Sequence, residues 1–239
     1  MSLLELCHVH KRFGQRPASI VLEDVSVAID DGELAVVWGL RGCGRSTLLR
    51  IAAGIEPPDG GTVRFDGVEL SSEGRLARAG RRQLGTGVAY CQRMLRATEG
   101  VTALEHATIG PLSHWVPARR ARQRALAALT RAEARHCERM RASELSSAEA
   151  VRVAIARALA LQPKLIVIDD PTAGVDLADR DGILALIRSL ADEGVAVLAS
   201  TAESTGLSEA DAAYTLGGGR LRGGAGRQPA PVIPLRAAV

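Results

Sequence analysis

The chain has 239 residues, 46% of them hydrophobic and 24% charged, which is enough for one large domain or two small lobes with a buried core. The formal net charge of +3 comes largely from four arginines within residues 217–239, where there is no acid, so the charge gives little support for a nucleic-acid-binding surface. The four cysteines are isolated and no run approaches the roughly 18–20 apolar residues that span a bilayer, so we predict neither a disulfide framework nor a membrane span.

The first predicted elements are two strands, over residues 3–9 and 20–29, which form an antiparallel edge layer. The segment between them contains Lys11-Arg-Phe-Gly14, and we expect Phe13 on this loop. The next strand, residues 33–38, is almost continuously apolar, as is typical of a parallel strand that is buried on both faces.

A glycine-rich loop and a helix follow this strand. Residues 39–47 read Gly-Leu-Arg-Gly-Cys-Gly-Arg-Ser-Thr, which has the spacing of a phosphate-binding P-loop. Glycines let the backbone curl tightly enough to aim several N–H groups at phosphate oxygens, and the helix adds the positive end of its dipole. Ser46 stands where a hydroxyl would hold Mg²⁺. Arg45 stands where the pattern has lysine, and it keeps the charge on a bulkier, forked group.

Shorter elements are predicted between this unit and residue 92. They are a loop at 54–61, a strand at 62–65 closed by an Asp66-Gly67 turn, a short surface helix at 75–84 and a strand at 87–92. From about residue 94 to 148 the strand patterns vanish, and Pro117 to Arg141 is predicted as a strong helix with solvated arginines. We interpret this segment as a helical subdomain inserted into an α/β core.

The rest of the chain returns to alternating helices and strands. A helix over 150–161 is predicted to be capped by Ser146 or Ser147, with Glu149 completing a capping box. The remaining expected elements are a strand at 165–168, a helix at 177–193, a strand at 195–199, a hairpin over 212–222 and a disordered tail from residue 223. The strand at 165–168 is fully apolar and ends in Asp169, where a carboxylate would lie at the ligand-binding edge of an open sheet.

The order of these pieces resembles the ATP-binding subunits of ABC transporters over roughly residues 3–222, nearest to the lipoprotein-release and macrolide-export group. The matching stretches are Lys11–Gly14 (A-loop), Gly39–Thr47 (Walker A), Tyr90–Gln92 (Q-loop), Leu145–Glu149 (signature), Leu165–Pro171 (Walker B) and Ala173–Asp176 (D-loop). The resemblance implies a P-loop NTPase core with an antiparallel edge layer and an inserted helical subdomain. It implies a core over 1–92 and 150–222, a helical subdomain over about 93–149 and a tail over 223–239.

The resemblance also implies ATP and Mg²⁺ as cofactors and assigns roles to residues. The implied nucleotide-binding residues are Phe13, Gly39, Gly42, Gly44, Arg45, Ser46, Thr47 and Ser146. The implied metal-binding residues are Ser46, Gln92 and Asp169, and the implied catalytic residues are Asp170 and Gln92. The implied partners are a transmembrane permease and a second ATPase subunit of the same or another chain, at the cytoplasmic face of the membrane, with no nucleic acid.

Four motifs depart from the family pattern. Arg45 replaces the lysine, Asp170 replaces a glutamate with a side chain shorter by one methylene, and Ala202 stands where a histidine belongs. The signature has become Leu-Ser-Ser-Ala-Glu, in which two glycines are lost and Glu149 adds a negative charge. We therefore expect weak hydrolysis.

Several functions fit this pattern to different degrees. The first is a transporter ATPase, active or weakened, and the second is a structural or regulatory subunit that binds ATP without hydrolysing it. A translation or DNA-repair protein of the same family usually carries two cassettes or a long coiled coil, neither of which is present here. A P-loop nucleotide kinase has no segment like Leu145–Glu149 before its Walker B strand.

Overall fold

The computed structural model describes residues 2–14, 19–72, 75–76, 87–92, 100–203 and 209–225. Its strands are Leu4–Phe13 (β1), Ser19–Ile29 (β2), Leu34–Trp38 (β3), Gly60–Phe65 (β4), Val68–Ser72 (β5), Arg75–Leu76 (β6), Val88–Cys91 (β7), Leu165–Ile168 (β8), Ala196–Thr201 (β9), Ala212–Gly217 (β10) and Arg220–Ala225 (β11). Its helices are Arg45–Ala52 (α1), Ala103–Ser113 (α3), Ala118–Arg131 (α4), Ser147–Leu159 (α5) and Leu177–Asp192 (α6), with 3₁₀ turns at Arg135–Cys137 and Ala142–Glu144.

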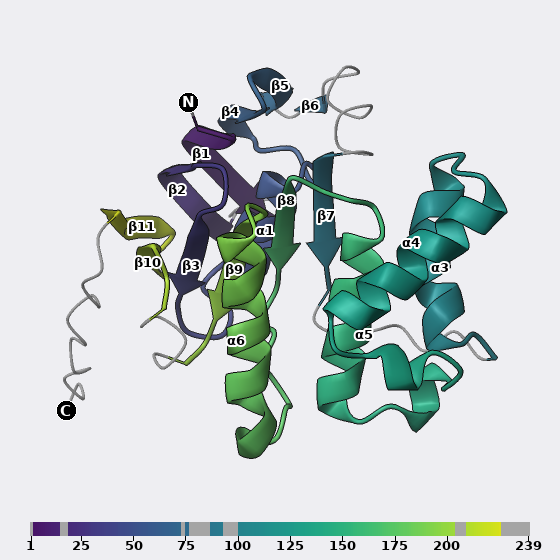
Figure 1. Ribbon diagram of the computed structural model, residues 1–239. Helices are drawn as coiled ribbons and strands as arrows, with labels where there is room; N and C mark the ends of the chain where they lie inside the picture. Colours follow the sequence, from purple (N-terminus) through teal and green to yellow (C-terminus); the bar gives the residue numbers. More distant parts are fainter. Residues whose placement is uncertain are drawn as a thin grey trace.

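A six-stranded, mostly parallel sheet forms the centre of the molecule, in the order β11-β10-β3-β9-β8-β7 (Figure 1). The pairs β10–β3, β3–β9, β9–β8 and β8–β7 are all parallel, whereas β10 and β11 form an antiparallel hairpin. The carboxyl ends of β3, β8 and β9 therefore meet at one edge of the sheet, where loops can form a ligand site.

Both faces of this sheet are covered, which explains its continuous apolar strands. In β3, Leu34 and Val36 face a cluster that contains side chains of α3, α4, α5 and α6. Ala35 and Val37 face the opposite cluster, which contains α1 and the second sheet. The side chains of β8 and β9 alternate between the two clusters in the same way, as the two-residue period of a strand requires.

The second sheet is antiparallel, in the order β2-β1-β4-β5-β6, and confirms the predicted edge layer. Two details of the prediction are wrong. Phe13 is not on a loop but is the last residue of β1, where it pairs with Ser19. Arg75–Leu76, expected in a surface helix, forms β6 and pairs with β5, while the rest of that expected helix lies outside the described residues.

The predicted helix over 117–141 is also shorter than expected, because α4 ends at Arg131. Glu133 adopts a left-handed conformation with φ of 55°, and the Ala134 N–H donates back to the Leu129 carbonyl at 2.8 Å. Ala134 and Cys137 are fully buried, so the chain turns into the core here rather than continuing outward. A glycine at position 133 would have indicated the end of the helix, but glutamate gives no such indication.

The helix that follows the altered signature begins earlier than predicted, at Ser147 instead of Ala150. Ser146 is its N-cap: the Glu149 N–H donates to Ser146 Oγ at 3.2 Å, and the Ser146 N–H donates to Glu149 Oε2 at 2.7 Å. The expected capping box is therefore confirmed.

At the other end of the chain the predicted hairpin is confirmed, but β11 continues to Ala225, so the tail cannot begin at residue 223. Residues 226–239 lie outside the described part. Within the described residues, none of the helices combines the length and the apolar character needed to cross a membrane.

Candidate functional site

The glycine loop connects the end of β3 to the start of α1, with Gly44 as the N-cap in a left-handed conformation at φ 106°. A Cβ at Gly44 would lie 2.8 Å from Cγ1 of Val21, and a Cβ at Gly39 would lie 2.7 Å from the Leu216 carbonyl oxygen. Side chains are therefore excluded at both positions, and the backbone can follow the tight path of the loop. This cradle is of the kind that holds a phosphate group at a helix N-terminus.

The first turn of α1 carries Arg45, Ser46 and Thr47. Ser46 is exposed and Thr47 is buried, while the Arg45 side chain is only 8% exposed. Arg45 Nη2 lies 3.5 Å from Asp170 Oδ2, whose side chain is 9% exposed. Arg45 Nη1 is buried and has no hydrogen-bond partner among the described residues. A buried guanidinium donor without a partner, next to the glycine cradle, fits the phosphate group that the P-loop pattern predicts.

Ser200 joins the two aspartates that follow β8. Its hydroxyl donates to Asp169 Oδ1 at 2.7 Å and accepts the Asp170 N–H at 3.0 Å. Asp170 itself is in a left-handed conformation with φ of 50°, which turns its buried side chain towards Arg45. Ser200 was not among the predicted site residues, although it directly follows the apolar run of residues 195–199.

Tyr90 lies on the other side of Asp169. Burial, and next the charge of Asp169, raise the pKa of Tyr90 to about 12. The phenol therefore stays protonated at neutral pH and can donate to the Asp169 carboxylate. Ser200 and Tyr90 together hold this carboxylate at the edge of the sheet.

A hollow of about 400 Å³ brings three predicted residues together: Gln92 from the end of β7, Asp169 from the end of β8 and Ser146 from the start of α5. Gln92 and Ser146 are exposed, and Asp169 is partly buried. Three side chains that carry oxygen atoms thus line the same hollow. Mg²⁺ prefers oxygen ligands, so these residues could hold it.

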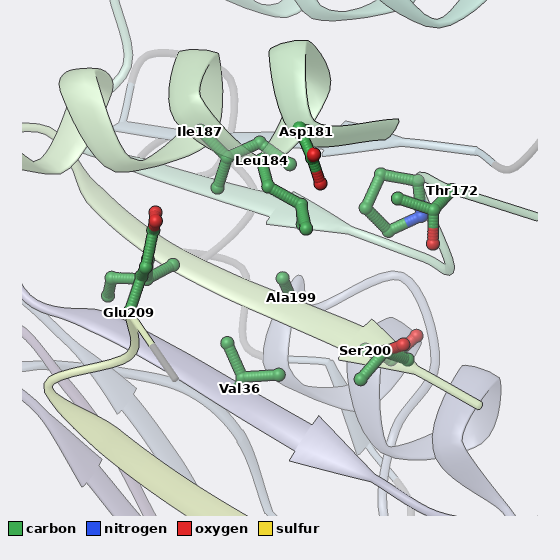
Figure 2. A pocket seen from close by; sticks show the side chains of 11 residues that line it. Val36, Thr172, Asp181, Leu184, Ile187, Ala199, Ser200 and Glu209 are labelled. Carbon is green, nitrogen blue, oxygen red and sulfur yellow. The ribbon is translucent and has the colours of Figure 1, made fainter. Parts of the chain in front are cut away.

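A separate cavity of about 140 Å³ lies between α6 and strands β3 and β9. Figure 2 shows Val36, Leu184, Ile187 and Ala199 on its walls, with Ser200 at one end. Of the residues predicted for nucleotide or metal binding, none lines it. Ser200 therefore connects this apolar cavity to the aspartate pair, and the cavity itself is not the nucleotide hollow.

Phe13 and Ala202 lie apart from these clusters. Phe13 is 41% exposed on the antiparallel sheet, with Lys11 Nζ 5.5 Å from its ring centroid. Lys11 is held by the Pro57 carbonyl at 2.8 Å and by Asp59 at 3.1 Å. Ala202 is partly buried just after β9, and its methyl group has no hydrogen-bonding capacity.

A family model described as ABC transporter matches residues 22–173, which is more than half of the chain. The chain belongs to the ABC transporter family. The glycine loop between β3 and α1 and the aspartates that follow β8 both lie within the matched residues.

Individual relatives extend the match to nearly the whole chain. The lipoprotein-releasing system ATP-binding protein LolD of Pseudomonas syringae pv. tomato is 35% identical over 222 residues, covering 92% of this chain and 97% of LolD. LolD of Paramagnetospirillum magneticum is 34% identical over 83% of this chain and 88% of its own length. The expected nearness to the lipoprotein-release group is therefore confirmed.

Solved structures confirm the fold. The dimeric structure of the ABC transporter cassette MJ0796 has a TM-score of 0.84 at 24% identity, covering 94% of this chain and 99% of the cassette. A nucleotide-free ATP-binding cassette of another ABC transporter has a TM-score of 0.81 at 25% identity, covering 95% of this chain and 92% of the cassette. The predicted α/β cassette with an antiparallel edge layer is thus shown.

Proposed function

We propose that this chain is the ATP-binding subunit of an ABC membrane transporter and that it binds ATP with Mg²⁺ but hydrolyses it slowly. The proposal places it at the cytoplasmic face of the membrane, attached to a transmembrane permease and paired with a second ATPase subunit. Its support is a 35% identity to LolD over 92% of the chain, with both aspartates and the P-loop in place.

In this proposal the chain holds the nucleotide with residues from both sheets. The Gly39–Gly44 backbone and Arg45 Nη1 hold the phosphates, and Phe13 stacks on the base. Thr47 supports the loop from its buried position. The metal ligands are Ser46, Gln92 and Asp169. Bound ATP would supply the phosphoanhydride bond. The chain's own groups would decide whether cleavage of that bond is accelerated.

The Arg45–Asp170 contact is the observation that supports slow hydrolysis. Asp170 is the carboxylate that would polarise the attacking water, yet its Oδ2 lies 3.5 Å from Arg45 Nη2. A carboxylate oxygen that faces a guanidinium group at that distance is not free to accept a hydrogen bond from the attacking water. The side chain is also one methylene shorter than glutamate, and a displacement of about 1 Å can cost on the order of 100-fold in rate.

The altered signature supports the same conclusion. The Ser146 N–H, Ser146 Oγ and then His136 stabilise the charged form of Glu149 and lower its pKa, so the carboxylate is ionised at neutral pH. Ser147 and Ala148 bring side chains where the family pattern has glycine. A partner's triphosphate would therefore meet negative charge and steric bulk at the start of α5.

A second function is favoured by the same observation. If the Arg45–Asp170 contact persists with nucleotide bound, the chain would be a non-hydrolysing structural or regulatory subunit of a membrane complex. Both functions require ATP binding and a membrane partner, and they differ only in turnover.

Single-turnover hydrolysis by the chain purified with its membrane partner tests this proposal. We expect ATP binding with Mg²⁺ and a hydrolysis rate well below about 1 s⁻¹, the lower end of ordinary enzyme turnover. The triple change Arg45→Lys, Asp170→Glu and Ala202→His should raise the rate, whereas Arg41→Lys, an exposed arginine in the same loop, should leave it unchanged.

Two results would overturn the proposal: absence of ATP binding in the assembled complex, or a wild-type rate at or above about 1 s⁻¹. A rate that remains undetectable after the triple change would favour the non-hydrolysing subunit.

A further inference from the structure

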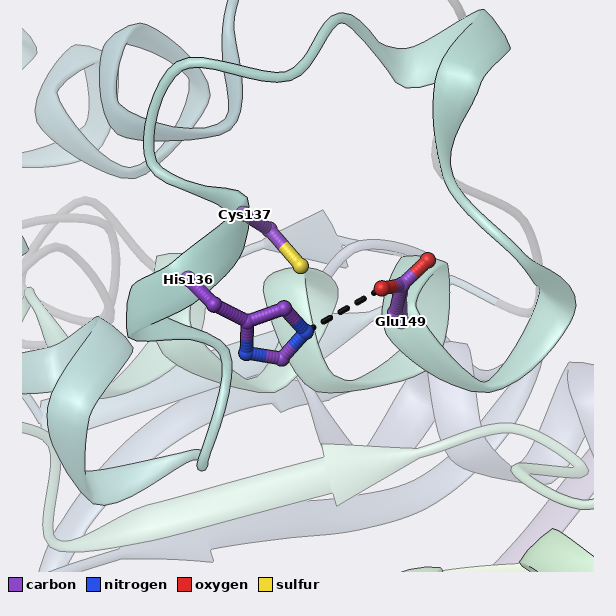
Figure 3. Close-up of side chains that lie close together, drawn as sticks. All are labelled: His136, Cys137 and Glu149. Atoms are coloured by element: carbon purple, nitrogen blue, oxygen red, sulfur yellow. Dashed lines mark hydrogen bonds and ion pairs between the residues drawn. The ribbon is translucent and has the colours of Figure 1, made fainter.

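His136, Cys137 and Glu149 lie together beside the start of α5 (Figure 3). His136 and Cys137 belong to the 3₁₀ turn Arg135–Cys137, and Glu149 belongs to the first turn of α5. An imidazole nitrogen, the thiol sulfur and a carboxylate oxygen all lie within 4.8 Å of one another. In the proposed function Glu149 caps α5 and places a negative charge beside Ser146, and His136 helps to keep Glu149 charged, whereas Cys137 has no role there.

The His136 and Cys137 side chains both face the Glu149 carboxylate. His136 Nε2 lies 3.1 Å from Glu149 Oε1, and Figure 3 shows the sulfur pointing towards the same pair. One nitrogen, one sulfur and one oxygen from two separate elements thus lie close enough together for a single cation to contact all three.

The backbone holds the cluster in place. The Cys137 N–H donates to the Ala134 carbonyl at 3.0 Å, and its own carbonyl accepts the Met140 N–H at 2.8 Å. Glu149 is fixed through its other oxygen, Oε2, by the Ser146 N–H. The backbone of Cys137 and the carboxylate of Glu149 are therefore in position before any ligand arrives, which lowers the cost of binding.

Two arginines, one in the 3₁₀ turn and one just after it, are paired with another carboxylate. The guanidinium groups of Arg135 and Arg139 both pair with Glu138, at 3.4 and 3.7 Å. The cluster opens to solvent through His136, whose side chain is 62% exposed, while Glu149 is 24% exposed. An ion can therefore reach the cluster from the His136 side.

We propose that His136, Cys137 and Glu149 form a binding site for a divalent transition metal ion, with zinc as the best fit. The imidazole, thiolate and carboxylate would each supply one ligand, and water would complete the tetrahedron. The thiol proton leaves to solvent as the sulfur binds, so no oxidant or reductant is needed.

The donor set selects this class of ion. A sulfur and an imidazole nitrogen disfavour Mg²⁺ and Ca²⁺, which require oxygen ligands, and favour borderline ions such as Zn²⁺ and Co²⁺. Ligand atoms around a tetrahedral zinc lie about 3.4–3.6 Å apart, from bond lengths of about 2.0–2.3 Å. The His136–Glu149 pair is already closer than this, so side-chain rotation to bring in the sulfur completes the site.

Metal binding would act on the start of α5. The ion would tie the 3₁₀ turn to Glu149, and its two positive charges would offset the carboxylate beside Ser146. This consequence rests on the proposed function, in which Ser146 approaches a partner's nucleotide, but the metal site itself does not depend on it.

Titration of the purified full-length chain with Co²⁺ in the absence of nucleotide tests the site. We expect one equivalent to give a sulfur-to-cobalt charge-transfer band and tetrahedral visible bands, which Zn²⁺ displaces. Cys137→Ser should abolish the charge-transfer band. His136→Ala and Glu149→Gln should weaken zinc affinity by more than about tenfold, the loss that even outer-shell changes cause at metal sites.

Matched controls separate this site from adventitious binding. Glu105→Gln alters an equivalent capping box at α3 whose glutamate belongs to no such ligand cluster among the described residues, and Cys7→Ser removes an exposed thiol elsewhere. Both should bind Co²⁺ like the unaltered chain. If Cys137→Ser fails to fold, Glu149→Gln decides the outcome, because glutamine can still complete the capping box.

The proposal is overturned if the unaltered chain gives no sulfur-to-cobalt band, if the band survives Cys137→Ser, or if Cys7→Ser or Glu105→Gln removes it. ATP binding is measured separately on the same samples, so the cobalt result can be interpreted even if the proposed ATP binding is not observed.

Discussion

Arg45 and Asp170 are 125 residues apart in the chain, yet they form a buried ion pair beside the glycine loop. Breaking a buried pair leaves one charge without compensation, which typically costs more than the pair contributes when intact. At the scale of single residues, Asp170 is therefore expected to affect both the stability of the cassette and the rate of ATP hydrolysis.

We predict that Asp170→Asn lowers the free energy of unfolding by about 3 kcal/mol, because Arg45 is then buried without a counter-charge. Asp31→Asn, at an exposed turn, should change it by less than about 0.5 kcal/mol. Urea denaturation of both variants without nucleotide measures the difference. Equal stability of the two variants would mean that solvent or another group compensates Arg45.

Local patterns allowed much of the site to be predicted from the sequence. The P-loop spacing located the cradle, and the apolar strand before Asp169 located the metal carboxylate. Whether these residues bind ATP and Mg²⁺ stays a prediction. The Ser200 bridge and the Arg45–Asp170 contact could not be predicted, because both join residues from elements far apart in the chain and Asp170 has a left-handed conformation.

At the scale of elements, the hairpin at the edge of the central sheet shows that glycine-rich composition can wrongly predict disorder. The Gly-rich stretch from residue 223 indicated a disordered tail, yet Gly223 pairs with Tyr214 inside β11. Gly223 has φ of 107°, and a Cβ there would lie 2.4 Å from the Ala213 carbonyl oxygen. The glycine belongs to the strand because only glycine fits that close approach.

Two adjacent glycines provide a test of this strand. Gly223→Ala should destabilise the chain by about 2 kcal/mol, since it combines a steric clash with a strained backbone. Gly224→Ala meets nothing within 4 Å and has no positive φ, so its effect should stay within about 0.5 kcal/mol. Thermal unfolding of both variants distinguishes them. Equal melting temperatures would indicate that β11 ends before Gly223.

The helical elements were predicted in type but not in extent. Alanine, leucine and arginine favour helix throughout residues 117–141, so propensity alone gives no reason to stop at Arg131. The stop comes from tertiary burial of Ala134 and Cys137. The capping box at Ser146 was predictable because its signal lies within four consecutive residues and does not depend on tertiary burial.

At the scale of the whole molecule, one buried cluster extends from the central sheet through α6 and α5 into α3 and α4. The division into a core and a helical subdomain stays a prediction, since this apolar contact is continuous. Arg131 adds a polar connection: its Nε lies 2.6 Å from Glu193 Oε2, and both of its terminal nitrogens lie 3.4 Å from Ser189 Oγ.

We predict that Arg131→Ala loosens α4 without unfolding the protein. Partly exposed ion pairs contribute at most about 1 kcal/mol, so global stability should change little. Hydrogen exchange of the α4 amides should nevertheless accelerate relative to those of β8 and β9, because local opening requires less than global unfolding. Arg122→Ala, an exposed arginine on the same helix, is the control. Unchanged exchange in α4 would show that apolar packing alone fixes the helix.

The pairing of β3 determines when during synthesis the phosphate cradle can form. Its hydrogen-bonded neighbours are β9 and β10, which are encoded more than 150 residues later. Until those strands leave the ribosome, β3 has two open edges and an apolar sequence, a combination prone to association with other chains. Such long-range pairing slows folding, so nascent chains of this protein should depend on chaperone protection until β9 and β10 have been translated.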